Sequence, residues 1–454
     1  MLEILPILMA ISSQLSGVNI RTFSAIIKSI YCISTGGVTM LNISRWSSEK
    51  GSSYSSVRRF YESSIDWMAI SLELFKHYYH CSERVYLLCG DETVEGKAGK
   101  KTPGKGWFYN SIYGVPIPGV CFFNLSVLDV SRGTSWVVGH EQLEKDPKGH
   151  KKKSKKKKKS ASAKNTEQEQ QPSVPKKRGR KKGSKNKPYQ VGYLFTVLSA
   201  LLGRFKTHLA SVGCTMPICY FVGDGHYGNR SGCKVCLDND LNLISTLRYN
   251  AALYYNYTGP QKRFGRRRKH GKRVDFTKLR KDDLVYKDST EEFDTFIYQI
   301  QAWNKRIPYC LLNVVILVVY DKEKQEWARQ LYFSTDLNLS YSTLMDYYHL
   351  RAQIELNFRD AKQYFGLSDF KNIKPEGVKN AVGLSFFMTN LSKVLVEQYQ
   401  QLTGEQDLSI QDLKAYFRGI KYVEEVIKNF QNGEEIIFKD EDYLEIAKVG
   451  AINR

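Results

Sequence analysis

The chain has 454 residues, of which 42% are hydrophobic and 13% aromatic. A chain of this length and composition can bury a large core and divide into several domains, which excludes a largely disordered protein. The formal net charge of +22 favours a polyanion, usually a nucleic acid, as the partner.

Most of the positive charge lies in one segment. Residues 148–187 contain 18 Lys and Arg residues and two acids, a net charge of +16 that leaves only +6 for the rest of the chain. The segment has almost no apolar residues, so residues 148–188 are predicted to be a disordered Lys-rich insertion that binds phosphates without sequence preference. A segment that only keeps the protein soluble is the alternative.

The cysteines and the hydropathy of the sequence indicate the cellular compartment of the protein. The nine cysteines form no regular framework, which is typical of reduced thiols in a cytoplasm. No stretch reaches the 18 apolar residues of a transmembrane helix. The sequence therefore predicts a cytoplasmic, nucleoid-associated protein without a membrane partner.

Residues 1–80 are predicted to form a helical DNA-binding domain. Three segments have helical apolar spacing: 2–15, 20–33 and 65–79. Between the second and third, Ser55 is predicted to cap a short helix that presents Arg58 and Arg59 to a DNA groove. A small helical bundle with a basic edge is equally compatible with these residues.

Two apolar runs of strand length each end in an aspartate. The first, 85–91, ends at Asp91, and an acid there is costly unless it is paired, bound to a metal or open to a cleft. Its neighbour Glu92 is the competitor, because strand alternation sends the two side chains to opposite faces. The second run, 217–224, ends at Asp224, for which turn formation in a glycine-rich loop is the alternative. Asp91 and Asp224 are therefore candidate carboxylates of a functional site.

The segments around these runs favour a sheet with helices. Residues 107–113 and 120–130 are predicted to form two antiparallel strands, and 189–209 an amphipathic helix. Residues 236–340 are predicted to be rich in strands, at 241–255, 293–302, 309–320 and 327–334. Within them, the basic run containing Arg266, Arg267 and Arg268 is predicted to contact the DNA backbone, with a solvated loop as the alternative.

The stretch YHLRAQIELNFRDAK carries four chemically important residues, Tyr348, Arg351, Glu355 and Lys362. Their spacing, Y-x2-R-x3-E-x6-K, places them within an arc of ~60° on one helix. A carboxylate flanked by two cations is well placed to hold a metal ion while the cations contact phosphates. An ordinary amphipathic helix with solvated charges is the alternative.

With this signature the sequence resembles the DDE transposases of bacterial insertion sequences, in the branch named for Y-R-E-K. The resemblance implies an α/β fold in which a ribonuclease-H-like mixed-sheet core is interrupted by a β-rich insertion and preceded by a helical domain. The core is expected over 81–147, 189–235 and 341–375, the insertion over 236–340, and a helical C-terminal region over 376–454.

The resemblance also implies the chemistry. Asp91, Asp224 and Glu355 are expected to bind two Mg²⁺ ions, for which Mn²⁺ can substitute. The residues expected to contact DNA phosphates beside the cut are Tyr348, Arg351 and Lys362. The expected partners are double-stranded DNA, as element ends and as target, and a second copy of the chain in a homodimer on DNA.

We therefore predict a DNA transposase that cuts the ends of its own insertion sequence and joins the 3′ ends to target DNA. Two alternatives stay open: an immobile DNA-binding protein derived from a transposase, and a metal-dependent DNA nuclease without strand transfer.

Overall fold

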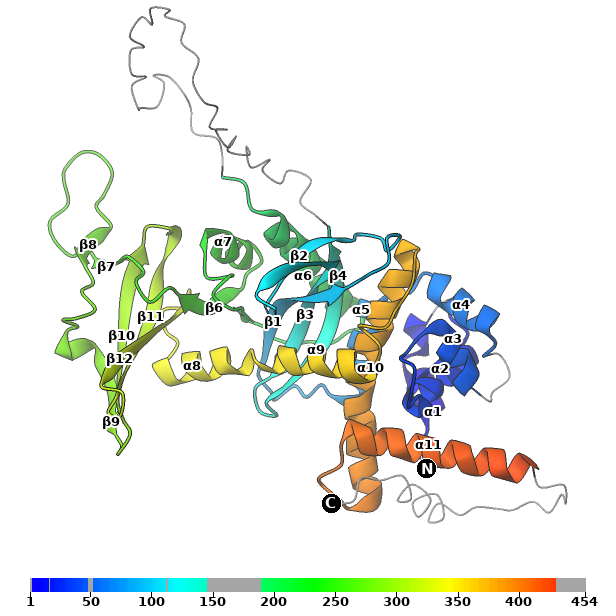
Figure 1. Ribbon diagram of the computed structural model, residues 1–454. Helices are drawn as coiled ribbons and strands as arrows, with labels where there is room; N and C mark the ends of the chain where they lie inside the picture. The colour runs from blue at the N-terminus through cyan, green and yellow to red at the C-terminus, as the bar shows by residue number, and fades with distance from the viewer. Residues whose placement is uncertain (1, 16, 48–51, 112, 145–188, 430–454) are drawn as a thin grey trace, which may run out of the picture.

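The structure is a computed structural model that describes residues 2–15, 17–47, 52–111, 113–144 and 189–429. The predicted Lys-rich insertion at 148–188 and the end of the C-terminal region lie outside them. The fold is mixed α/β. Within the described residues, 12 strands form one mixed sheet with helices packed around it (Figure 1).

Short helices gather at the N-terminal end of the molecule (Figure 1, blue). They are α1 (Ile4–Ala10), a 3-10 turn at Ser12–Gln14, α2 (Ile20–Cys32), α3 (Met40–Trp46), α4 (Tyr54–Glu62) and α5 (Trp67–Tyr78). The cap of α4 is Ser53 and not Ser55, because the hydroxyl of Ser53 accepts from the N–H of Ser56 while Ser55 already lies in the first turn. Unlike the first four helices, α5 packs on strand β4 of the sheet.

Six strands form the central part of the sheet. They are β1 (Tyr86–Gly96), β2 (Gly106–Asn110), β3 (Val115–Asp129), β4 (Thr134–Leu143), β5 (Tyr220–Val222) and β6 (Asn242–Leu247). One edge of β3 pairs antiparallel with β1, and the other pairs with β2 and β4. β5 runs parallel to β1, and β6 runs parallel to β5. The resulting order is β4-β3-β1-β5-β6, with β4 added beside β3 although the sequence did not predict it.

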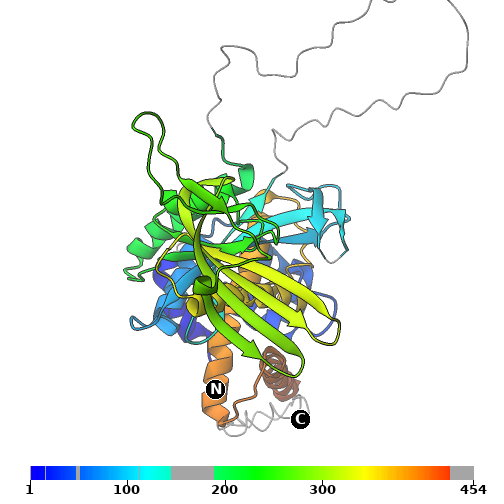
Figure 2. The same cartoon turned by 90° about the vertical axis from the view of Figure 1, so that its left-hand side faces the viewer.

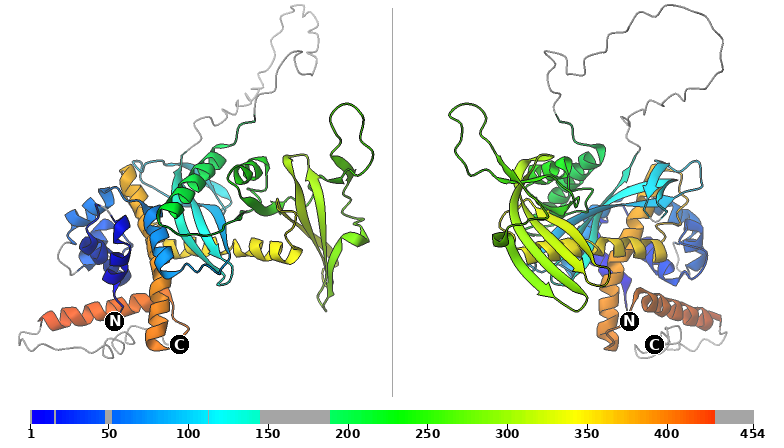
Figure 3. Two further views of the ribbon diagram at one scale, coloured as in Figure 1. Left: turned by 180° about the vertical axis from the view of Figure 1, so that it is seen from behind. Right: turned by 60° about the vertical axis from the view of Figure 1, so that its left-hand side comes forward.

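Helices cover both faces of these strands. The parallel step from the β1–β3–β4 group to β5 needs a crossover, which α6 (Tyr193–Ser211) supplies, and α7 (Arg230–Asp238) joins β5 to β6. Views from the front and the back place α6 on one face and α9 on the other (Figures 1 and 3). The edge strand β4 is closed by the long helix α10 (Pro375–Thr403), because the buried amide of Asn390 bonds to both the N–H and the C=O of Val137.

The predicted strand-rich region extends the same sheet. It contains β7 (Leu253–Asn256), β8 (His270–Arg273), a 3-10 turn at Lys281–Asp283, β9 (Leu284–Ser289), β10 (Phe293–Asn304), β11 (Ile307–Asp321) and β12 (Glu326–Ser334). β12 pairs antiparallel with β6, which makes the two regions continuous. The curved face of these strands is turned toward the viewer in Figure 2.

The single helix predicted over Tyr348–Lys362 is two helices placed end to end (Figure 1). They are α8 (Tyr341–Leu350) and α9 (Gln353–Tyr364). Arg351 and Ala352 keep helical dihedral angles, but their N–H groups bond to carbonyls three residues back instead of four. The backbone is therefore wound more tightly here, as a 3-10 turn, than in the α-helices on either side.

The last described helix is α11 (Ile410–Asn429), which packs against α2 and α10. None of the helices in the described ranges is long and apolar enough to cross a membrane.

Candidate active site

Asp91 lies inside a strand and not at its end, which corrects the prediction from sequence. β1 continues to Gly96 because β3 pairs with it along its whole length, so that Asp91 lies opposite Asn124. Asp224 follows β5 by two residues, in the loop before α7, and Glu355 lies in the first turn of α9. The three predicted carboxylates thus come from three separate elements.

The charges of all three predicted carboxylates act on one group, the thiol of Cys89. Burial is the main cause that raises the pKa of Cys89, and the charges of Asp91, Asp224 and Glu355 each raise it further, while Arg351 opposes them. The two contacts of Arg351 place Glu355 near Asp91, which lies two residues from Cys89 on β1. The fold therefore gathers residues that are far apart in the sequence.

The carboxyl group of Asp91 lies in a site with excess negative charge. Burial raises its pKa from 3.8 to about 7, and Glu92 and Asp224 add to the rise. The backbone N–H of Glu92, at 2.8 Å, and the guanidinium of Arg351 act in the opposite direction without cancelling it. Such a shift in a cluster of acids is typical of a functional site.

Arg351 bridges two of the predicted carboxylates. Its Nη1 lies 3.5 Å from Oδ2 of Asp91, and its Nη2 lies 3.0 Å from Oε1 of Glu355. Only 19% of its side chain is exposed. Among the described residues, no three Asp, Glu, His or Cys side chains form a group that could hold a metal ion. In this arrangement the guanidinium of Arg351 offsets the charges of Asp91 and Glu355.

Glu92 lies on the opposite face of β1 from Asp91, as strand alternation predicts. Burial raises its pKa to about 7, and the charge of Asp224 raises it further. The ring of Tyr227 is buried against Phe195 and Phe221 on the α6 side of the sheet. Tyr227 follows Asp224 by three residues, so this packing fixes the loop that carries Asp224. Sequence reasoning missed its role, although an aromatic residue in a glycine-rich loop is a signal of such an anchor.

Lys362 is held by a buried acid. Its Nζ lies 2.9 Å from Oε1 of Glu95, and the hydroxyl of Ser368 donates to Oε2 of Glu95 at 2.7 Å. Glu95 is 4% exposed, and it shares a face of β1 with Asp91 because the two residues are four apart. The pair ties the end of α9 to β1. Side chains alternate between the two faces of a strand, so the spacing of four residues could have placed Glu95 on the same face as Asp91.

Tyr348 packs near the end of α8. Its half-buried ring meets that of Tyr332 edge to face, with centroids 5.1 Å apart. The four residues of the signature thus have different surroundings. Arg351 and Glu355 contact each other, Lys362 reaches β1, and Tyr348 packs on β12.

The other predicted DNA contacts lie away from this cluster. Arg58 and Arg59 are exposed on α4, where Arg58 pairs with Glu62 at 3.1 Å and Arg59 bonds to the hydroxyl of Ser56. These contacts stay within one helix, so both guanidinium groups remain open to solvent.

The basic run lies in the exposed loop between β7 and β8. Arg266, Arg267 and Arg268 are all exposed. Arg268 lies over the ring of Tyr257, 4.5 Å from its centroid, and donates to the backbone carbonyl of His270. One of the three arginines therefore also orders the loop itself.

Comparisons with known proteins give the class. A family model described as DDE superfamily endonuclease matches residues 21–306, well over half of the chain. The chain therefore belongs to the DDE superfamily endonucleases. The matched range includes Asp91 and Asp224 and ends before Glu355.

Two further comparisons were made. No curated protein matches the chain. Among solved structures, it is similar to a piggyBac transposase in a synaptic complex with hairpin DNA, at 11% identity and a TM-score of 0.35. The alignment covers 78% of this chain and 59% of the transposase, so the chain spans less than two thirds of that protein.

Proposed function

We propose that this protein is a DNA transposase that cuts the ends of its own insertion sequence and joins the 3′ ends to target DNA. The observation that carries the proposal is that Arg351 joins Asp91 to Glu355, at 3.5 and 3.0 Å, while the charge of Asp224 raises the pKa of the same Asp91. Three acids from separate elements, in a chain of the DDE superfamily endonucleases, are what phosphodiester chemistry requires.

The proposed core is ribonuclease-H-like, in the Y-R-E-K branch of bacterial insertion-sequence transposases. The order β4-β3-β1-β5-β6, with three antiparallel strands followed by two parallel ones, supports it. We place the core at 81–147, 189–235 and 341–375. The other proposed units are the DNA-binding helices at 1–80, the Lys-rich insertion at 148–188, the β-rich insertion at 236–340 and the C-terminal region at 376–454.

The chemistry of the acids fits a hard divalent cation. Carboxylate oxygens are the ligands that Mg²⁺ prefers. Burial is the main cause of the raised pKa of Asp91, and a cation would offset the charges of Glu92 and Asp224 that add to the rise. Asp91, Asp224 and Glu355 are the proposed ligands of two Mg²⁺ ions, with Mn²⁺ as a substitute. When bound, such ions activate the attacking hydroxyl group and stabilise the leaving oxygen.

The cations of the signature have their own part in the proposal. The planar guanidinium of Arg351 can bind a phosphate through two parallel hydrogen bonds, and Lys362 acts as a point charge. Tyr348 is the third proposed phosphate contact. In the structure Arg351 and Lys362 are paired with acids, so phosphate binding requires that they exchange partners.

DNA is also the proposed partner of two basic surfaces away from the acidic cluster, on helix α4 and on the loop between β7 and β8. Arg58 and Arg59 on α4 are proposed to bind element ends, and Arg266, Arg267 and Arg268 to bind the backbone. Because two ends are cut together, a homodimer on DNA is part of the proposal.

A cleavage and joining assay tests the proposal. Purified protein is incubated with Mg²⁺ and DNA from both flanks of its own gene, beside Glu355→Gln and the exposed control Glu397→Gln. Glu355→Gln is expected to abolish nicks and joined ends while binding of the flank DNA stays within a few-fold, and the control is expected to cut normally.

The assay also separates the alternatives. Binding without cutting by the wild-type protein identifies an immobile DNA-binding protein. Cutting without joined products identifies a nuclease, and normal cutting by Glu355→Gln removes Glu355 from the site.

A further inference from the structure

The hairpin formed by β2 and the start of β3 presents an aromatic surface with no core beneath it. Trp107 is 67% exposed and Tyr109 is 64% exposed, whereas Phe108 between them packs toward the core. Across the hairpin, Trp107 lies opposite Pro118 and Tyr109 opposite Pro116, both exposed. Residues directly opposite each other share a face, so these four side chains form one surface, the hairpin platform.

The platform lies on the same face of the sheet as Asp91. Pairing between β1 and β3 is continuous, with Asp91 opposite Asn124 and Gly96 opposite Gly119. Even-numbered residues of β3 from Pro116 to Asn124 therefore share the face of Asp91. The distance from Asn124 to Pro118 along β3 is six residues, or about 20 Å at ~3.3 Å per residue.

Lys362 lies between Asp91 and the platform. Its partner Glu95 is four residues beyond Asp91 along β1, in the direction of the hairpin. Asp91, Lys362 and Trp107 therefore follow one another along a single face. A DNA strand that passes from Asp91 to Lys362 would reach the hairpin next.

The segment that leads into the platform carries only positive charge. Between Lys97 and Pro118 the sequence has four lysines and no acidic residue. Lys100 and Lys101 are exposed in the turn that precedes β2. Exposed aromatic rings beside exposed lysines suit a partner that is anionic and has flat apolar faces, which describes a nucleic acid with unpaired bases.

We propose that the hairpin platform binds the DNA strand next to the cleavage site, with bases unpaired from their complement stacked on Trp107 and Tyr109. This inference rests on the proposed function, because that function brings the strand to this face. It adds a binding surface for single-stranded DNA that lies outside the acidic cluster, the Y-R-E-K residues, helix α4 and the loop between β7 and β8.

The test compares single-stranded and duplex DNA in EDTA, where cleavage does not interfere. The probes are a fluorescein-labelled 30-nucleotide oligo(dT) and a labelled 30-base-pair duplex, followed by fluorescence anisotropy. The double variant Trp107→Ala/Tyr109→Ala is compared with Trp327→Ala, another exposed tryptophan, on β12. Thermal unfolding of each variant checks that the fold is kept.

We expect the double variant to bind oligo(dT) at least about tenfold more weakly, because each lost stacking contact lowers affinity severalfold or more. Duplex affinity should fall much less, and Trp327→Ala should leave both affinities within a few-fold. Photocrosslinking of 5-iodouracil-containing oligo(dT) should place crosslinks on Trp107 or Tyr109.

Three results would overturn the inference: unchanged oligo(dT) binding by the double variant, an equal loss with Trp327→Ala, or a change from dimer to monomer with no change in DNA binding. The last would show that the platform pairs with a second copy of the chain. Failure of the wild-type protein to bind any DNA would instead contradict the proposed function itself.

Discussion

Two aspartates on neighbouring strands have opposite surroundings. Asp91 lies on β1 opposite Asn124 of β3, and Asp129 ends β3 five residues further along, about 17 Å away at ~3.3 Å per residue. Asp129 is 1% exposed and fully bonded, whereas Asp91 is crowded by other acids. One sheet thus holds one aspartate that is paired with a cation and backbone donors, and another that lies among acids.

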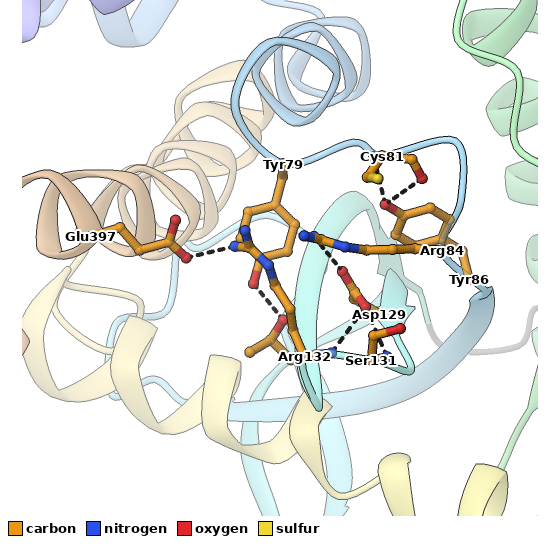
Figure 4. Close-up of polar contacts among 9 residues, drawn as sticks. Tyr79, Cys81, Arg84, Tyr86, Asp129, Ser131, Arg132 and Glu397 are labelled. Carbon is orange, nitrogen blue, oxygen red and sulfur yellow. Dashed lines mark hydrogen bonds and ion pairs between the residues drawn. The ribbon is translucent and has the colours of Figure 1, made fainter. Parts of the chain in front are cut away.

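The bonds around Asp129 form a closed network (Figure 4). Its carboxylate accepts from Arg84 at 3.1 Å and from the backbone N–H groups of Ser131 and Arg132 at 3.0 and 3.1 Å. Arg132 in turn pairs with Glu397 of α10 at 2.7 Å. Every acid in this network has a cationic partner, so the turn between β3 and β4 is fixed to α10.

The acids around Asp91 do not each have a cationic partner. Its one neighbouring cation, Arg351, is 3.5 Å away and is shared with Glu355, while Glu92 and Asp224 repel it. Holding such a cluster together costs stability, which the rest of the fold supplies. A group of acids with shifted pKa values is what the proposed role of Asp91 as a metal ligand would require.

The largest expected effect is the loss of stability when the paired aspartate, Asp129, is replaced. Asp129→Ala leaves Arg84 and two backbone N–H groups without their acceptor, so the free energy of unfolding should fall by about 3–5 kcal/mol. Urea denaturation measures it. The exposed partner Glu397→Ala should lose no more than about 1 kcal/mol. Similar small losses in both variants would show that the network does not stabilise the turn.

A smaller effect of opposite sign is expected at Asp91. Because its pKa is raised from 3.8 to about 7, the folded protein holds a proton there that the unfolded chain has released, and stability falls as pH rises through this window. Asp91→Asn should therefore gain stability in EDTA, by about 2 kcal/mol more at pH 8 than at pH 5.

The control for this prediction is Asp275→Asn. Hydrogen bonds from the hydroxyl and N–H of Thr277 lower the pKa of Asp275, so its contribution is present throughout the range from pH 5 to pH 8. Its variant should show no gain that grows with pH. A gain of equal size in both variants, or none with Asp91→Asn, would contradict the charge crowding described for Asp91.

The smallest expected effect is on the salt dependence of DNA binding when Lys362 is replaced. Lys362 is paired with an acid, as Asp129 is paired with a cation, but it lies beside the acidic site. If DNA takes Lys362 from Glu95, Lys362→Met should lower the slope of log affinity against log salt by about one. Glu95→Gln removes the competing acid and should strengthen DNA binding a few-fold. An unchanged slope would mean that Lys362 stays with Glu95 and serves only to hold α9.

Much of the fold could be predicted from local patterns. The apolar runs before Asp91 and Asp224 become β1 and β5, because buried strands need continuous apolar residues. The periodic segments likewise become α6, α10 and most strands of the insertion. β4 was missed, although its residues are largely buried, because its place is set by pairing with β3.

The candidate site was predictable in part. Helical spacing predicted that Arg351 and Glu355 face each other, and they do so at 3.0 Å. The polar half of β1, from Glu92 to Gly96, has no strand-like apolar run and forms a strand because β3 pairs with it. For the same reason, no local pattern could pair Glu95 with Lys362, which a different element brings to it.

The central claim is that Asp91, Asp224 and Glu355 act as one metal site. Electron paramagnetic resonance of Mn²⁺ titrated into the protein without DNA tests it directly, with Asp91→Asn, Asp224→Asn, Glu355→Gln and the neighbouring control Glu92→Gln. The account predicts that each of the first three weakens Mn²⁺ binding by at least about tenfold and that Glu92→Gln changes it much less. Mn²⁺ binding that survives all three substitutions, or that is lost only with Glu92→Gln, would contradict it.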